Sequence, residues 1–277
     1  MKFVTVFFDI EGSIERPYIQ SIDVENVITR ILDLLDCHSV RATFNIVGIF
    51  YDRFPSLVKE ILSSGHEIAL HGLSHENLLY SSKVDLELCI ARAESAVKRC
   101  IGRSVRGFRS PWLLKSNRLY AILNSHGYSW VSNVYFKIFP EAFYRPDLAM
   151  PSITRALFSS VFGIWRLKYK EVPYRVMGNL YEIPLLSLMD GDLLGPVNPF
   201  QETPSSVIKY AVDSLVREAK QTRNFFNMNF HDWIIGTANR IKILDEALNN
   251  IKTLNEVLFL PAIDMLNFVK VGLKCPK

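Results

Sequence analysis

Apolar segments typical of buried strands alternate with amphipathic segments along most of this 277-residue chain. Residues 3–8, FVTVFF, form a continuous apolar run that ends at an acidic residue, as expected for a strand covered on both faces. Residues 22–35 then place Ile and Leu at helical spacing. Strands that alternate with helices through short loops form parallel βαβ units, which build either a barrel or an open sheet.

The alternation continues to the end of the chain. We expect further strands at residues 40–47, 66–70, 105–110, 128–133, 181–187, 225–231 and 257–261. The expected helices lie at residues 55–64, 82–99, 117–126, 204–220, 240–252 and 262–270. Because no internal repeat or linker divides the chain, we predict a single α/β domain over residues 1–277.

Residues 134–179 interrupt this alternation and are interpreted as an insertion. The segment is rich in aromatic, proline and basic residues, as in ITRALFSSVFGIWRLKYK at residues 153–170. One interpretation is a structured flap that extends a substrate cleft. The other is a helix that lies on a membrane surface through its aromatic and basic side chains. Aromatic residues that pack in a core are commoner than aromatic residues that face lipid.

Composition excludes several classes of protein. The chain is 49% hydrophobic, enough for a large core, and its net charge of +4 comes without the basic run typical of nucleic-acid binding. Four cysteines lie far apart, which fits free thiols in a reducing compartment better than a disulfide framework or a zinc finger. The sequence shows no secretory signal and no apolar stretch of about 18 residues, which predicts a cytoplasmic protein.

Two acids, Asp9 and Glu11, follow the first apolar run. Residues two apart in a strand share a face, so both carboxylates lie together at the carboxyl end of a buried strand. Two carboxylates in such a place are costly unless a positive group lies beside them, and a metal ion would supply it. The alternative is a pair of solvated loop acids beside Gly12.

The motif HGLSH places His71 and His75 after the short strand at residues 66–70. Histidines four apart come onto one side of a helical turn, so both imidazoles can reach one cation. The alternative is a pair of loop histidines that cap the next helix. Because the acid pair lies at the same end of a parallel sheet, a shared metal site is favoured.

Two further motifs carry polar residues at strand ends. In RGFRSPW, Arg109 can hold a carboxylate with its planar guanidinium, and Pro111 can present the backbone N–H of Trp112 to a ligand. The alternative is a surface arginine beside an ordinary turn. In NMNFHDW, His231 ends a strand and is either a third metal ligand or a general acid. His38, His66 and His126 are interpreted as structural.

The order of these motifs resembles the polysaccharide deacetylase family, the NodB-homology or carbohydrate esterase 4 group. The motifs are FDIEG, ATFNIVG, GHEIALHGLSH, RGFRSPW and NFHDW. The resemblance covers residues 3–133 well and residues 180–270 loosely. It implies a distorted (β/α)7 barrel that uses a divalent metal to remove an N-acetyl or other N-acyl group from an amino sugar.

The resemblance also implies a role for each matching residue. Its implied metal ligands are Glu11, His71 and His75, and the implied metal is Zn²⁺, with Co²⁺, Mn²⁺ or Ni²⁺ as alternatives. Asp9 matches the catalytic base, Arg109 the partner of that base, and His231 the catalytic acid. The residues expected to contact the sugar are Pro111, Trp112 and Trp233. A glycan, glycolipid or sugar-nucleotide precursor is the implied substrate, with contact at the inner membrane surface if it is a glycolipid.

The chain departs from the family pattern in two places. The usual pair of adjacent aspartates is replaced by Asp-Ile-Glu, which resembles the branch with allantoinase-like and some peptidoglycan deacetylase-like members. No motif identifies the acid that orients His231, for which Glu182, Asp190 and Asp192 are the alternatives. Two other functions therefore stay open: a non-catalytic carbohydrate-binding member of the fold, and a small-amide hydrolase of the allantoinase-like branch.

Overall fold

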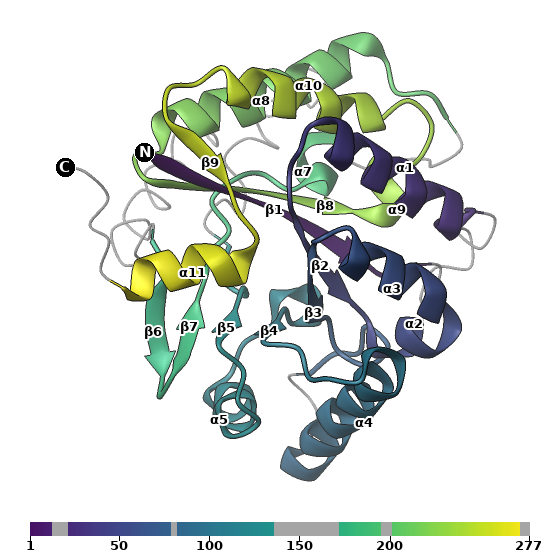
Figure 1. Ribbon diagram of the computed structural model, residues 1–277, viewed down its shortest axis with the longest axis vertical. Helices are drawn as coiled ribbons and strands as arrows, with labels where there is room; N and C mark the ends of the chain where they lie inside the picture. The colour runs from purple at the N-terminus through teal and green to yellow at the C-terminus, as the bar shows by residue number, and fades with distance from the viewer. Residues whose placement is uncertain (13–21, 79–81, 136–171, 195–200, 272–277) are drawn as a thin grey trace, which may run out of the picture.

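The computed structural model describes residues 1–12, 22–78, 82–135, 172–194 and 201–271. One sheet runs through this part of the chain in the order β6-β7-β5-β4-β3-β2-β1-β8, and β9 also pairs with β1 (Figure 1). Its strands are β1 (Lys2–Ile10), β2 (Thr43–Ile46), β3 (Glu67–Leu70), β4 (Gly107–Phe108), β5 (Trp130–Val131), β6 (Tyr174–Met177), β7 (Leu180–Glu182), β8 (Phe225–His231) and β9 (Val257–Phe259). The pairs between these strands are parallel except β6 with β7, which is antiparallel.

The sheet curls into a half-barrel. An isolated parallel bridge between Met189 and Asn229 links the segment after β7 to β8, the last strand of the sheet order. The side chain of Asn227 supports the same contact, because it accepts a hydrogen bond from Leu186 N at 2.8 Å and donates one to Pro184 O at 2.7 Å. The expected α/β fold of the deacetylase type is therefore confirmed.

Helices connect the strands and pack around the curled sheet, and α11 (Ala262–Lys270) contributes side chains to the inner core (Figure 1). They are α1 (Val24–Cys37), α2 (Gly48–Arg53), α3 (Pro55–Ser63), α4 (Lys83–Ile101), α5 (Asn117–Ser125), α7 (Asp190–Leu194), α8 (Ser205–Gln221), α9 (Asp232–Ile235), α10 (Ile241–Lys252) and α11 (Ala262–Lys270), with a 3₁₀ turn at Pro111–Leu113. Ser82 caps α4 by accepting a hydrogen bond from Asp85 N, and Gly102 ends α4 in the left-handed conformation at φ +73°.

Alternate residues of β1 face two separate hydrophobic cores. Val4, Val6, Phe8 and Ile10 belong to the larger core between the sheet and its covering helices. Phe3 and Phe7 belong to a smaller inner core, to which α11 also contributes Ala262, Met265 and Leu266. The period of two residues therefore places Asp9, which follows Phe7 by two, on the inner face of the sheet.

The expected strands and helices are observed with boundaries shifted by a few residues. Short helices α2, α7 and α9 were not expected, and β6 lies inside the segment interpreted as an insertion. Residues 136–171 of that segment lie outside the described residues, and so does Cys275. The other three cysteines are free thiols. Among the described helices, none combines the length and the apolar character that crossing a bilayer requires.

The three histidines interpreted as structural have structural partners. His38 and His126 occupy the C-cap positions of α1 and α5, and they lie 2.7 Å from Asp245 and 3.0 Å from Glu94. His66 is buried, and its Nδ1 accepts a hydrogen bond from Ala42 N at 3.1 Å. Burial lowers the pKa of His66 to about 4, so its ring is neutral at physiological pH.

Candidate active site and metal centre

The acid pair at the end of β1 is buried. Asp9 and Glu11 keep 2% and 7% of their surface exposed, which excludes the alternative of solvated loop acids. In the parallel register, Asp9 lies beside Asn45 of β2 on one side and beside His231 of β8 on the other. Because side chains in register on adjacent parallel strands point to the same face, these three residues share the inner face of the sheet.

Three donors surround the Asp9 carboxylate. Arg109 Nη1 and Asn45 Nδ2 donate to Asp9 Oδ1 at 2.8 and 2.7 Å, and Asn229 Nδ2 donates to Oδ2 at 3.1 Å. Burial alone would raise the pKa of Asp9, but nearby positive charge, first that of Arg109, and the hydrogen bond from Asn45 outweigh this effect and lower the pKa. Asp9 is therefore ionised at neutral pH. Asn45 and Asn229 were not predicted as site residues, although both fall in strand patterns with an inward face.

Arg109 is held in one orientation by its surroundings. Its side chain is fully buried, and it donates from Nε to Ser132 O at 3.2 Å and from Nη2 to Ser132 Oγ at 2.9 Å. It also donates to Asn229 Oδ1, and its guanidinium lies 4.3 Å from the centre of the Phe7 ring. The alternative of a surface arginine is therefore wrong, and its pairing with Asp9 is observed.

Glu11, His71 and His75 offer ligand atoms that all lie within 4.8 Å of one another. Glu11 Oε1 is 3.1 Å from His75 Nε2 and 3.6 Å from His71 Nε2. His71 Nδ1 lies 2.9 Å from the carbonyl of Arg109, which can only accept, so Nδ1 carries the proton and Nε2 presents a lone pair. Within the described part of the chain, the buried His71 Nε2 has no hydrogen-bond partner.

These donors fit a divalent metal. One carboxylate oxygen and two imidazole nitrogens are a usual ligand set for a catalytic site that keeps a position open. A ligating histidine is commonly oriented by a hydrogen bond from its other ring nitrogen, as His71 is by Arg109. A lone pair that is buried without a donor, on His71 Nε2, is costly unless a cation meets it.

The HGLSH segment is a tight turn and not the helical turn that the spacing of its histidines suggested. Gly72 and His75 have φ of +73° and +63°, and residues 71–78 form no helix. The Glu76 carboxylate stabilises the turn by accepting hydrogen bonds from Leu73 N at 3.0 Å and from Ser74 N at 2.6 Å. Both imidazoles nevertheless reach Glu11, because the left-handed residue 75 turns its side chain back toward residue 71.

The residues after His231 hold Glu11 in place. Asp232 is buried and accepts hydrogen bonds from the backbone N–H groups of Glu11 and Gly12 at 3.3 and 3.0 Å. Trp233 Nε1 donates to Glu11 Oε2 at 2.9 Å. Glu11 Oε2 is thereby engaged, while Oε1 faces the two histidines. Trp233 was predicted only as a sugar contact, and Asp232 was not predicted as a site residue.

Asp190, at the start of α7, is the acid that orients His231. Its Oδ1 lies 2.7 Å from His231 Nδ1, and its Oδ2 accepts a hydrogen bond from His231 N at 2.7 Å. Burial alone would lower the pKa of His231. The negative charge of Asp190, with smaller contributions from Glu11 and Asp9, instead raises this pKa to about 10. The imidazole is therefore protonated at neutral pH, and its Nε2 lies 3.8 Å from both Asp9 Oδ2 and Glu11 Oε1.

The other two candidate acids have different partners. Glu182 is fully buried and accepts hydrogen bonds from Asn133 N at 2.7 Å and from Val134 N at 2.9 Å. Asp192 accepts a hydrogen bond from the Tyr135 hydroxyl. Neither carboxyl contacts His231, so Asp190 alone of the three performs this task.

The acids and histidines line one pocket of about 210 Å³. Ser110, Trp112, Leu113 and Met189 complete its lining. Trp112 is 59% exposed at the mouth, where its ring centre lies 5.2 Å from that of His75. Pro111 is buried, and the two residues that follow it, Trp112 and Leu113, have φ of +57° and +54°. This uncommon backbone conformation turns the Trp112 side chain toward solvent beside the cluster.

Comparison with known proteins agrees with this geometry. The curled α/β sheet and the Glu-His-His cluster define a barrel-type protein with a candidate metal site at the carboxyl ends of its strands. Residues 2–131, slightly less than half of the chain, match the polysaccharide deacetylase family.

Individual relatives fall within the same group. The chain is 29% identical over 132 residues to a chitooligosaccharide deacetylase of Sinorhizobium fredii, which covers 47% of this chain and 59% of that protein. It is 27% identical over 179 residues to a peptidoglycan deacetylase of Helicobacter pylori, 65% of this chain and 58% of that protein. Each alignment thus spans less than two thirds of the relative. The fold matches a candidate polysaccharide deacetylase of Mycobacterium smegmatis with TM-score 0.75 at 19% identity, over 99% of this chain and 92% of that chain.

Proposed function

We propose that this protein hydrolyses the N-acetyl group of an amino sugar within a glycan. The observation that carries the proposal is the convergence of three units in one pocket: the Glu11-His71-His75 cluster, the Asp9-Arg109 pair and the His231-Asp190 pair. Hydrolysis of an amide needs an activated water, a proton acceptor and a proton donor for the leaving amine. The relatives are deacetylases of chitooligosaccharides and peptidoglycan, which supports an N-acetylated sugar as the substrate class.

Glu11, His71 and His75 would hold the metal, for which we propose Zn²⁺. Zinc accepts mixed oxygen and nitrogen ligands, and Co²⁺, Mn²⁺ or Ni²⁺ are compatible with the same set. A divalent ion bound there would polarise the acetyl carbonyl and lower the pKa of water from 15.7 toward about 7.

Asp9 is the proposed proton acceptor. Its carboxylate is ionised and buried, and Arg109 and Asn45 fix the direction of Oδ1 while Oδ2 is the atom nearer His231. A fixed carboxylate at the edge of the metal cluster can take the proton of an attacking water without reorganising. Arg109 acts as its positioning partner, since it touches Asp9 and lies behind it, away from the pocket lining.

His231 is the proposed proton donor to the leaving amine. Asp190 binds Nδ1, so the proton on Nε2 points to the pocket that Asp9 and Glu11 line. The alternative role of His231 as a third histidine ligand is less favoured, because the ligand atoms that lie within 4.8 Å of one another belong to Glu11, His71 and His75 and not to His231. The non-catalytic alternative rested on the lack of an identified acid that orients His231, and Asp190 now fills that position.

We further propose that the sugar rests against aromatic residues near the mouth. Trp112 is exposed beside His75 and lines the pocket, and the half-buried Trp233 lies behind His231, with 5.8 Å between their ring centres. Aromatic faces suit the apolar faces of sugar rings. Pro111 would support this contact by fixing the backbone before Trp112.

A glycolipid substrate at a membrane surface is a further hypothesis. It rests on the aromatic and basic composition of residues 153–170, which lie outside the described residues. Binding of the protein to anionic vesicles at low salt would support it, and the absence of binding under those conditions would remove it.

Acetate release tests the proposed function. The purified protein, reconstituted with Zn²⁺, is incubated with N-acetylated chitooligosaccharides and with peptidoglycan fragments, and acetate is measured enzymatically. We expect release that depends on the metal and that falls about 10²- to 10⁴-fold in Asp9→Asn. Hydrolysis of allantoin-like small amides, which releases no acetate and is followed by loss of the amide itself, would favour the small-amide alternative if the sugars release no acetate. Binding of sugars without hydrolysis of any of these substrates would favour the non-catalytic alternative.

A further inference from the structure

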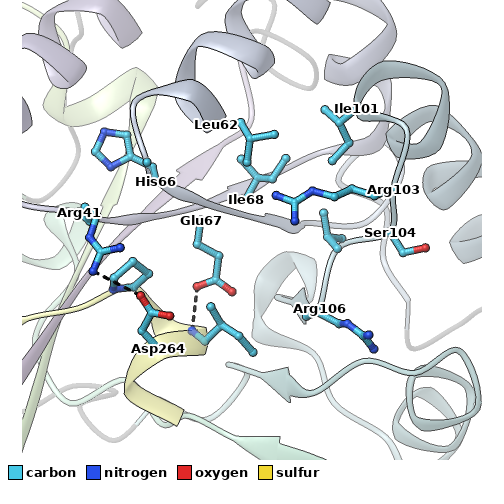
Figure 2. A pocket seen from close by; sticks show the side chains of 14 residues that line it. Arg41, Leu62, His66, Glu67, Ile68, Ile101, Arg103, Ser104, Arg106 and Asp264 are labelled. Carbon is cyan, nitrogen blue, oxygen red and sulfur yellow. Dashed lines mark hydrogen bonds and ion pairs between the residues drawn. The ribbon is translucent and has the colours of Figure 1, made fainter. Parts of the chain in front are cut away.

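A second cavity lies at the opposite end of the parallel strands from the candidate active site. It has a volume of about 280 Å³ and is formed where β3 begins, at the loop before β4 and at the start of α11 (Figure 2). The catalytic candidates lie at the carboxyl ends of β1, β3 and β8, whereas this cavity contacts the amino ends of β3 and β4. The two cavities share no lining residue.

Positive charge exceeds negative charge in the lining. Arg41, Arg103 and Arg106 face two carboxyl groups, Glu67 and Asp264. Arg41 lies 3.5 Å from Asp264, so this pair largely cancels. Within the described part of the chain, Arg103 makes no ion pair, and Figure 2 shows its side chain extending across the cavity toward the side of Ile68. A concave site with surplus charge of one sign concentrates ligands of the other sign.

Glu67 does not neutralise this surplus, because its carboxyl group is committed to the fold. Oε1 accepts a hydrogen bond from Trp130 Nε1 at 2.9 Å, and Oε2 accepts from Thr43 Oγ1 at 2.8 Å and from Ile263 N at 3.0 Å. The last contact satisfies a backbone donor in the first turn of α11. Burial raises the pKa of Glu67 to about 7, so a substantial fraction of the group is uncharged at neutral pH.

Apolar side chains form the remaining wall of the cavity. These are Leu62, Ile68, Ile101, Val105, Pro261 and Ile263. An apolar wall with a few convergent polar groups is the usual character of a small-molecule site. A guanidinium binds carboxylate and phosphate oxygens with paired, directional N–H donors.

We propose that this cavity binds a small organic oxyanion, a carboxylate or phosphate ester with a short apolar body. The Arg103 guanidinium would bind the anionic group. Arg106 points away from Arg103 and donates to Gly127 O at 3.0 Å, so it would contribute through its charge and not through a direct hydrogen bond (Figure 2). The apolar body would lie against Ile68 and Ile263. The proposal does not depend on the deacetylase activity, because the two cavities are separate.

Methyl NMR of the full chain tests the proposal. Isoleucine δ1 and methionine ε methyl groups are labelled, and sodium butyrate, methyl phosphate and uncharged butyramide are titrated separately. We expect saturable shifts at Ile68, Ile101 and Ile263 with at least one of the two anions and none with butyramide. Met189, which lines the other pocket, reports any anion that binds at the metal centre instead.

Variants of Arg103 test whether this arginine binds the anion. Arg103→Ala and Arg103→Gln should each lower the affinity for the anion at least about tenfold, because each removes the charge-assisted hydrogen bonds between the guanidinium and the anion. Arg223→Ala removes an exposed arginine outside the cavity and should leave the affinity unchanged. The proposal is overturned if no saturable shift occurs with either anion, if only Met189 responds, if butyramide binds equally well, or if the Arg103 variants bind as the wild type does.

Discussion

Asp190 binds His231 at two points, through the ring Nδ1 and through the backbone N–H, both at 2.7 Å. The carboxylate comes from the first residue of a five-residue helix, and the histidine is the last residue of β8. Two contacts fix both the position of the residue and the rotation of its ring. The proton on Nε2 is therefore aimed at the pocket before a substrate arrives, which is what a general acid requires.

Asp190→Asn should lower kcat by about 10²- to 10⁴-fold and shift the pH profile. The Asp190 charge is the largest of the contributions that raise the pKa of His231 to about 10. Because a proton donor must be protonated, the activity is retained up to its pKa and lost above it. Removal of the Asp190 charge lowers that pKa, so the basic limb of the kcat profile should move to lower pH. An unshifted basic limb in this variant would contradict the assignment.

His231→Ala should retain the metal and lose most of the turnover. The residue lies 3.8 Å from Glu11 and is not needed to complete the Glu-His-His set. Metal content and acetate release are measured on the same preparation, with the wild type as reference. Loss of the metal together with the activity would instead assign His231 as a ligand, and wild-type activity would exclude it as the acid.

Trp233→Phe should weaken metal binding about tenfold, because it frees the Glu11 oxygen that the indole N–H holds. The measurement is competition with a chromophoric chelator. Trp130→Phe is a matched control, since Trp130 donates an equivalent hydrogen bond to Glu67 at 2.9 Å, away from the site. The control should lose stability but keep its metal affinity. Equal affinities in wild type and Trp233→Phe would show that Trp233 does not position Glu11.

Glu67 should make the protein less stable as the pH rises. Burial raises its pKa to about 7, so the folded state holds its proton more tightly than the unfolded state does. Its contribution to the free energy of unfolding is complete below about pH 4.5 and is lost as the pH rises through about 7, a change of up to about 3 kcal/mol.

Urea unfolding between pH 5 and pH 8 measures this effect. The Glu67→Gln variant should show a flatter dependence on pH than the wild type, because glutamine does not ionise. Glu60→Gln makes the same chemical change at an exposed position and should follow the wild type. Parallel curves for all three proteins would mean that Glu67 does not titrate in this range.

The sequence predicts elements whose pattern is local and fails where contacts are distant. The apolar alternation around β1 places Asp9 on the inner face, and the structure agrees. Asp190 could not be chosen over Asp192, because two residues in one short helix differ only in direction, and the contact joins residues 41 positions apart. Likewise, the hydrogen bond between Trp233 and Glu11 crosses 222 positions and leaves no local pattern.

Backbone conformation is the second reason why the structure differs from what the sequence predicted. The spacing of His71 and His75 indicated a helical turn, but His75 adopts a left-handed φ of +63°. A histidine in the sequence does not indicate a left-handed conformation, which is uncommon outside glycine. Here the hydrogen bonds from the turn to Glu76 stabilise it. Glu11, His71 and His75 nevertheless lie together as expected, because both backbone conformations bring the imidazoles to the same carboxylate.

Metal content measured by mass spectrometry tests the central claim most directly. Untagged protein and a His71→Ala/His75→Ala double variant are compared after exposure to Zn²⁺ and removal of the excess. The Glu-His-His cluster predicts about one ion per chain in the wild type and none retained in the variant. Absence of metal in both proteins, also after exposure to Co²⁺ or Mn²⁺, would contradict a metal-dependent deacetylase at this site.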